Sequence, residues 1–177
     1  MEDFSNILKI FLSKIERNQR EEHLKYFFRD FLKKTFYRNN AINTKGNFDF
    51  AIHKDESDKS KLEVIIETKT PESKEMITEN NFSVKSMYQI LLYFFQERIN
   101  NKNNDLKNIV ITNFYEYFIF DASDFEKLFY ENKDLKKEFE NWNNDKKTSK
   151  KTNLFYEYQK IKKNLQNFLK YSLRNFY

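Results

Sequence analysis

Apolar residues recur at every third or fourth position in the first part of the chain. This spacing predicts amphipathic helices over residues 3–17 and about 20–37, because positions three or four apart share one face of a helix. Residues 38–46 are polar and rich in turn-forming side chains, so we expect a connecting turn there. The apolar face of the second helix is expected to contain Leu24, Phe27, Phe28, Phe31 and Leu32.

The spacing then changes to the alternation that is typical of strands. Phe48, Phe50 and Ile52 alternate with other positions, and the next apolar run is rich in β-branched residues. Residues 54–61 between these runs are entirely polar and predict a hairpin loop. The predicted strands cover residues 48–53, 62–69, 108–113 and 116–121.

Helical spacing returns in the second half of the chain. We expect helices over residues 83–99, over 124–142 in one or two pieces, and over about 154–174. The chain has no internal repeat, and 177 residues fit a single domain. The predicted fold class is therefore α/β, or α+β, with a small mixed β-sheet flanked by helices.

Glycine and proline occur once each, and cysteine does not occur. A single glycine, Gly46, cannot build a Walker A loop, a dinucleotide-binding turn or a G-x-S-x-G nucleophile elbow. Disulfides, cysteine–zinc sites and thiol nucleophiles are excluded. Two histidines, His23 and His53, argue against a histidine-rich metal site. Any metal would be a hard cation held by carboxylates.

The net charge of +5 is unevenly distributed along the chain. Residues 1–145 carry 23 basic and 26 acidic side chains, whereas residues 146–177 carry nine basic side chains and one acidic. This basic C-terminal helical segment indicates contact with a polyanion, and the alternative is a solvated helix face in a lysine-rich protein. No signal-peptide pattern is visible and the longest apolar run, residues 90–95, is short, so we expect a cytoplasmic protein without membrane contact.

Three charged residues lie on the two central predicted strands. Asp49 is an acid among apolar residues, and Glu67 and Lys69 end the next apolar run. Residues two apart on a strand point to the same side, and a hairpin would bring Asp49 across from them. Two carboxylates can hold Mg²⁺, while an adjacent lysine orients the attacking water or neutralises a phosphate. The alternative is a structural Asp49–Lys69 ion pair, and Glu-x-Lys alone is uninformative because it occurs three times.

The residues Phe48-Asp49 and Glu67-Thr68-Lys69 resemble the signature of the PD-(D/E)XK nuclease superfamily. From about Glu21 to Phe155, the chain resembles the N-terminal endonuclease domain of type IIG restriction enzymes, which join an endonuclease to an adenine methyltransferase. The resemblance implies a restriction-endonuclease-like core and a Mg²⁺-dependent DNA endonuclease of a restriction–modification system, in which Mn²⁺ can substitute. The blocks that carry it are residues 42–49, 64–71 and 111–121.

The resemblance also implies a role for each signature residue. Asp49 and Glu67 would bind the metal, and the Thr68 carbonyl would add a ligand. Lys69 would orient the attacking water or help to deprotonate it. Together these residues would hydrolyse the phosphodiester bond.

Two predicted helices add further candidates. The first helix of this fold often supplies a carboxylate, for which we prefer Glu21 over Glu22 because it lies nearer the apolar face; the alternative is two acids that favour the helix dipole. Gln89 and Tyr93 resemble the Gln-x-x-x-Tyr motif of RecB-type nucleases, so Gln89 could bond the site lysine or a phosphate. The alternative is a polar pair on a half-buried helix. His53, on the same strand face as Asp49, could assist the site residues, but a solvated histidine at a strand end is the expectation we prefer.

The expected partner is double-stranded DNA. The chain lacks the glycine-rich and Asn-Pro-Pro-aromatic motifs of the methyltransferase, so a separate methyltransferase or specificity subunit is a candidate second partner. A transient homodimer is a further candidate, because cleavage of both strands needs two active sites. The alternative function is a catalytically inert, nuclease-like DNA-binding or assembly subunit left from a longer restriction enzyme. The third hypothesis is a helical interaction protein whose charged residues are all surface positions.

Overall fold

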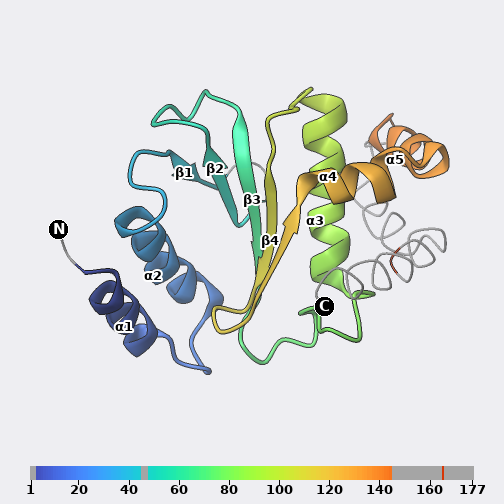
Figure 1. The fold of residues 1–177 in the computed structure, drawn as a ribbon. Helices are drawn as coiled ribbons and strands as arrows, with labels where there is room; N and C mark the ends of the chain where they lie inside the picture. The colour runs from blue at the N-terminus through green and yellow to red at the C-terminus, as the bar shows by residue number, and fades with distance from the viewer. Residues whose placement is uncertain (1–2, 45–47, 145–164, 166–177) are drawn as a thin grey trace.

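A five-stranded mixed β-sheet forms the centre of the protein (Figure 1). The computed structural model describes residues 3–44, 48–144 and 165. The strands are β1 (Ile42–Asn43), β2 (Phe50–His53), β3 (Leu62–Thr68), β4 (Asn108–Thr112) and β5 (Tyr117–Asp121). They lie in sequence order across the sheet, with β3 and β4 parallel and the other neighbours antiparallel. The predicted α+β class with a small mixed sheet is confirmed.

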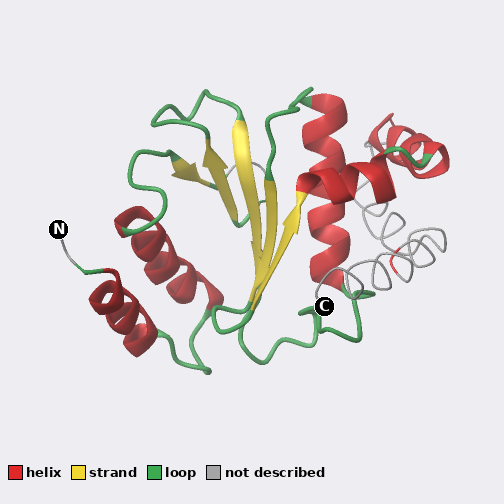
Figure 2. Ribbon diagram, viewed as in Figure 1, coloured by secondary structure: helices red, strands yellow, loops and turns green. Residues whose placement is uncertain are grey.

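The helices cover both faces of this sheet. They are α1 (Phe4–Lys14), α2 (Glu21–Lys34), α3 (Lys85–Phe95), α4 (Ala122–Phe125) and α5 (Lys133–Asn144), with π-helical segments η1 (Gln96–Asn100) and η2 (Glu126–Tyr130). Figures 1 and 2 show α1 and α2 on one face and α3, α4 and α5 on the other. The helix α3 is part of the crossover that the parallel neighbours β3 and β4 require.

The strand β3 is buried on both faces, which explains its nearly continuous apolar sequence. Val64 and Ile66 belong to the apolar cluster that contains Phe28 of α2, whereas Ile65 belongs to the cluster that contains Leu91 of α3. Burying each of these side chains contributes roughly 1.5–3 kcal/mol. The two cores therefore fix the direction in which every side chain of β3 points.

The same alternation decides where the polar end of β3 points. Glu67 continues the side of Ile65, toward α3, and Thr68 continues the side of Ile66, toward α2. Adjacent residues of the signature thus face opposite layers of the molecule.

A β-bulge lies near the loop end of the β2–β3 hairpin. Ile52 pairs with Val64 but His53 pairs with Leu62, so Glu63 is an extra residue on β3. The irregularity stands at the opposite end of the strand from Glu67, and the pairs between it and Glu67 follow a regular antiparallel ladder.

Several predicted boundaries differ from the observed ones. The turn expected at 38–46 contains the two-residue edge strand β1, which pairs with β2. The helical region expected over 124–142 in one or two pieces does form in two, because Asn132 turns the chain and its Oδ1 accepts bonds from the amides of Asp134 and Leu135 at the start of α5. The predicted basic helix lies outside the described residues, apart from Leu165, which is buried in the α3 core. No described helix combines the length and hydropathy that a bilayer crossing needs.

Candidate functional site

The carboxyl end of β3 gathers most of the predicted site residues. Thr68 ends the strand, and the amide of Lys69 donates to the carbonyl of Thr112 at 2.9 Å, which extends the β3–β4 pairing by one residue. The backbone of Lys69 is therefore held by the parallel neighbour rather than left in a loose loop.

Asp49 is fixed against this strand end by its own carboxylate. Its Oδ2 accepts the amide of Thr68 at 2.7 Å and the Thr68 hydroxyl at 2.9 Å. Asp49 immediately precedes β2, so these two bonds continue the hairpin by means of a side chain. Charge-assisted bonds of this kind restrain the carboxylate in a single position.

Glu67 and Lys69, called the inner pair below, are buried together. The ammonium of Lys69 donates to Oε1 of Glu67, while Oε2 of Glu67 is buried without a hydrogen-bond partner among the described residues. Glu67 is only 1% exposed. Burial, aided by the negative charge of Asp49, raises the pKa of Glu67 to about 8 even though Lys69 lowers it.

Three residues form a second cluster, the outer group, which consists of Glu21, Lys25 and Asp49. The ammonium of Lys25 lies 2.6 Å from Oδ1 of Asp49 and 2.9 Å from Oε1 of Glu21, and the Thr68 hydroxyl lies 3.3 Å from the same Glu21 oxygen. Burial alone would lower the pKa of Lys25, but its bonds to Asp49 and Glu21 raise it well above the usual value. Lys25 therefore stays charged.

The helix α2 thus brings Glu21, and not Glu22, to the strand end. Glu22 is 86% exposed, and it lies 3.2 Å from the Lys25 ammonium on the solvent side. The preference for Glu21 that follows from its angle to the apolar face agrees with this geometry. Sequence reasoning missed Lys25, whose signal was its position one turn after Glu21 in the helix.

Three further candidates lie on α3 and β2. Gln89 of α3 has a buried Oε1 without a described hydrogen-bond partner, and Lys69 bonds to Glu67 instead of to Gln89. Tyr93 packs its ring edge-on against Phe48 at 4.8 Å between centroids. The expectation that His53 is solvated is wrong: it is fully buried, and its Nδ1 lies 2.6 Å from the carbonyl of Ser60, which closes the hairpin loop.

The fit of a metal ion depends on how these carboxylates are arranged. Among the described residues, no group of three or more His, Cys, Asp or Glu side chains is arranged as a ready set of ligands. The donor chemistry nevertheless suits a hard cation, since Glu67 carries an unpaired buried oxygen and Asp49 and Glu21 supply further carboxylate oxygens. Lys25 already lies against two of these oxygens and would have to move.

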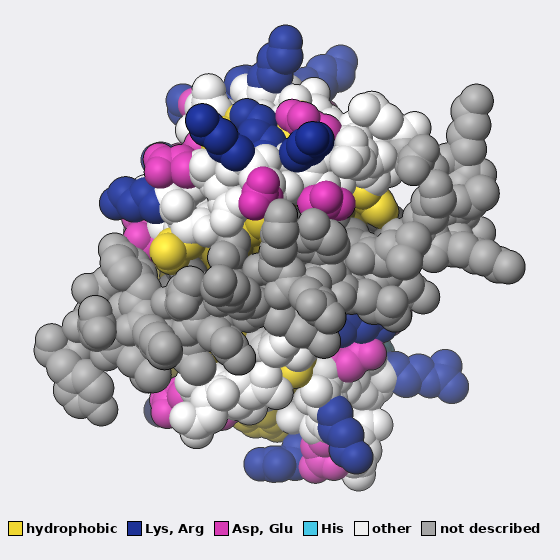
Figure 3. All heavy atoms as spheres, turned by 90° about the vertical axis from the view of Figure 1, so that its right-hand side faces the viewer, with side chains coloured by type: hydrophobic (Ala, Val, Ile, Leu, Met, Phe, Trp, Pro, Cys, Tyr) yellow, Lys and Arg dark blue, Asp and Glu magenta, His cyan; other side chains and the backbone are white. Residues whose placement is uncertain are grey.

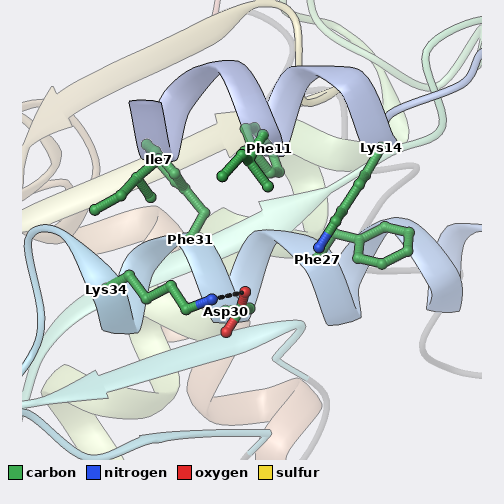
Figure 4. A pocket seen from close by; sticks show the side chains of 8 residues that line it. Ile7, Phe11, Lys14, Phe27, Asp30, Phe31 and Lys34 are labelled. Atoms are coloured by element: carbon green, nitrogen blue, oxygen red, sulfur yellow. Dashed lines mark ion pairs between the residues drawn. The ribbon is translucent and has the colours of Figure 1, made fainter. Parts of the chain in front are cut away.

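Two hollows lined by described residues lie away from this site. Figure 4 shows a crevice between α1 and α2, where Phe11 and Phe31 stack and the Lys34–Asp30 ion pair lies at one side. A wider hollow near Arg98 and Lys107 lies at the opposite ends of β4 and β5 from the site. On the face seen in Figure 3, basic and acidic side chains of the described residues are interspersed.

The fold and the site define an α+β domain in which carboxylates ion-paired with Lys25 and Lys69 lie at the carboxyl end of β3. The chain belongs to the family described as "Domain of unknown function (DUF7149)", whose model matches residues 1–177. No curated protein and no solved structure matches the chain.

Proposed function

We propose that this protein is a divalent-metal-dependent DNA endonuclease of a restriction–modification system, with its active site at the carboxyl end of β3. The observation that carries the proposal is the buried Glu67 carboxylate, which has one oxygen on the Lys69 ammonium and the other unpaired. An acid placed in such surroundings is costly to ionise unless a bound cation compensates its charge, and such acids are enriched at functional sites. The resemblance to PD-(D/E)XK nucleases assigns catalytic roles to the same residues.

Each residue of the site has a definite task in this proposal. Asp49, held by Thr68, and Glu67 would hold Mg²⁺ or Mn²⁺, with the Thr68 carbonyl and Glu21 as additional oxygen donors. When bound, the metal would lower the pKa of a water molecule and offset negative charge on the phosphate. Lys69 would orient the attacking water or neutralise the phosphate.

Gln89 and the expected partners complete the proposal. The buried amide oxygen of Gln89 is available to a donor that enters the site from the α3 side. Double-stranded DNA is the proposed substrate, and a methyltransferase or specificity subunit would supply sequence recognition, because phosphate contacts alone do not specify sequence. A transient homodimer would provide the two active sites that double-strand cleavage needs.

A cleavage assay tests the proposal through Lys69. Supercoiled and single-stranded DNA are incubated with the protein in Mg²⁺, Mn²⁺ or EDTA, and nicking is followed on gels. Lys69→Ala is compared with Lys107→Ala, which removes the lysine of an exposed Lys–Glu pair at the other end of the β3–β4 pairing. We expect metal-dependent nicking that the Lys107→Ala variant retains and the Lys69→Ala variant loses. A folded Lys69→Ala protein that cuts as fast as the parent would contradict the mechanism.

The outer group favours a second candidate function. Because Lys25 is ion-paired with both Glu21 and Asp49 without a metal, the same site suits a nuclease-like DNA-binding or assembly subunit that does not cut. Such a protein would bind DNA with an affinity that falls steeply with salt. Salt-dependent binding without metal-dependent cleavage in the same assay would select this candidate.

A further inference from the structure

The Lys25 ammonium lies where the two carboxylates of the outer group meet. Its Nζ is within 3 Å of one oxygen from Asp49, before β2, and one from Glu21, on α2. Two segments that are distant in sequence are thus joined through one positive charge. Ion pairs held by two acceptors are geometrically more restricted than single surface pairs.

The outer group needs a cation for a simple reason of hydrogen-bond counting. The Thr68 hydroxyl lies 2.9 Å from Asp49 and 3.3 Å from Glu21, but a hydroxyl carries a single hydrogen and can donate fully to only one of them. The two carboxylates would otherwise repel each other across a partly buried space. Lys25 supplies the missing donors and the compensating charge.

Lys25 also has an ion-pair partner outside the outer group. Its ammonium already lies 3.2 Å from Glu22, the exposed neighbour of Glu21 in the first turn of α2, and its own side chain is 16% exposed. A lysine side chain is flexible, so the ammonium can turn from Asp49 toward Glu22 and keep an ion-pair partner. The Lys25 ammonium can therefore leave Glu21 and Asp49 and still be paired with a carboxylate.

We infer that Lys25 is the resident cation of the outer group: its ammonium holds Glu21 and Asp49 in the metal-free protein and leaves them when a divalent cation binds. This inference rests on the proposed function. The unpaired oxygen of the buried Glu67, whose pKa is raised by the charges of Asp49 and Glu21, is the independent sign that the carboxyl end of β3 accepts a further ligand. Lys25 accordingly competes with the divalent cation for Glu21 and Asp49, and this competition lowers the affinity of the site for the metal.

The test measures metal affinity and stability, using Mn²⁺ alone as the probe. Calorimetric titration compares the full-length protein with Lys25→Met and with Lys85→Met, which removes the same charge from an exposed Lys85–Glu75 pair. We expect Lys25→Met to bind Mn²⁺ about tenfold more tightly, equivalent to about 1.4 kcal/mol. The same variant should melt at a lower temperature in EDTA and recover in Mn²⁺, whereas Lys85→Met should bind like the parent.

A second comparison keeps the inference testable if Lys25→Met does not fold. The double variant Glu21→Gln/Lys25→Met removes one charge of each sign, and it should bind Mn²⁺ more tightly than Glu21→Gln alone. Unchanged or weaker binding upon removal of Lys25, in a protein whose parent binds Mn²⁺, overturns the resident-cation role and leaves the proposed metal site standing. Absence of Mn²⁺ binding in parent and variants alike overturns the proposed metal-dependent function itself.

Discussion

Two buried glutamates stand at opposite ends of the sheet, and their surroundings differ. Glu97 follows α3 and is 2% exposed, yet both of its oxygens accept side-chain amides, from Asn101 at 2.6 Å and from Asn103 at 3.1 Å. Asn103 in turn donates to the carbonyl of Leu62, which ties the segment after α3 to the start of β3. Glu97 has every partner that a structural carboxylate requires.

Glu67 is as deeply buried as Glu97, but its carboxylate oxygens are not both hydrogen-bonded. One oxygen meets the Lys69 ammonium, and the other meets no hydrogen-bond donor among the described residues. Unpaired buried acceptors also occur on the side chains of Asn43, Ser86 and Gln89, but these are neutral and less costly to leave without a donor. The comparison teaches that burial alone does not mark a site, whereas an acid whose hydrogen bonding is incomplete does.

The largest expected effect comes from making Glu67 neutral. Glu67→Gln should reduce metal-dependent cleavage by about 100-fold or more, because a metal-binding carboxylate is lost while Lys69 keeps an oxygen to donate to. Cleavage rates and circular dichroism measure this. Glu97→Gln is the matched control and should cleave at the parental rate, so equal losses in the two variants would break the comparison.

The next effect is a dependence of stability on pH in the metal-free protein. The pKa of Glu67 is about 8 in the folded state and 4.5 in its ordinary state. Folding therefore favours the protonated form, and this contribution is complete below pH 4.5 and lost as pH rises toward 8. Urea unfolding in EDTA should show a decline of about 3 kcal/mol from this group between pH 5 and pH 8.

The Glu67→Gln protein serves as the reference for that decline, since all other groups titrate in both proteins. Its stability should fall less over the same range. If the unfolding free energies of the two proteins changed in parallel with pH, the pKa of Glu67 would not be raised by folding. The cost of burying its carboxylate would then be offset by another interaction.

The smallest effect is expected from Glu97. Glu97→Gln places an amide among the amides of Asn101 and Asn103, so one donor loses its acceptor. The unfolding free energy should fall by about 1–3 kcal/mol with cleavage unchanged. Urea denaturation measures the change, and a variant as stable as the parent would show that the Glu97 network is dispensable.

The main outline of the site was predictable because its residues lie on regular elements. The apolar run that ends at Ile66 predicts a buried strand, and alternation then places Glu67 and Lys69 on one side of it. The helical angle that favours Glu21 follows from the apolar face of α2. The β2–β3 hairpin is predicted by the polar loop that separates the two strands.

The remaining features depend on tertiary contacts that leave no local signal. Lys25 matters because α2 packs with its first turn beside Asp49, and one lysine among many in this chain carries no mark of that approach. The strand β1 is too short to show alternation, and it forms because β2 offers a free edge. His53 is buried because the loop folds back to bring the carbonyl of Ser60 to its ring.

The bulge at Ile52 and His53 has a consequence for how the hairpin can vary. A shift of one residue in strand pairing would turn every side chain of β3 to the opposite face, that of Glu67 included. The extra residue, Glu63, confines such a mismatch to the loop end, while the ladder toward Thr68 stays regular. Insertions or deletions in the exposed loop at 54–61 can therefore be absorbed there, so this loop is the segment in which relatives of the protein can differ in length while the chemistry at the far end of the strand is preserved.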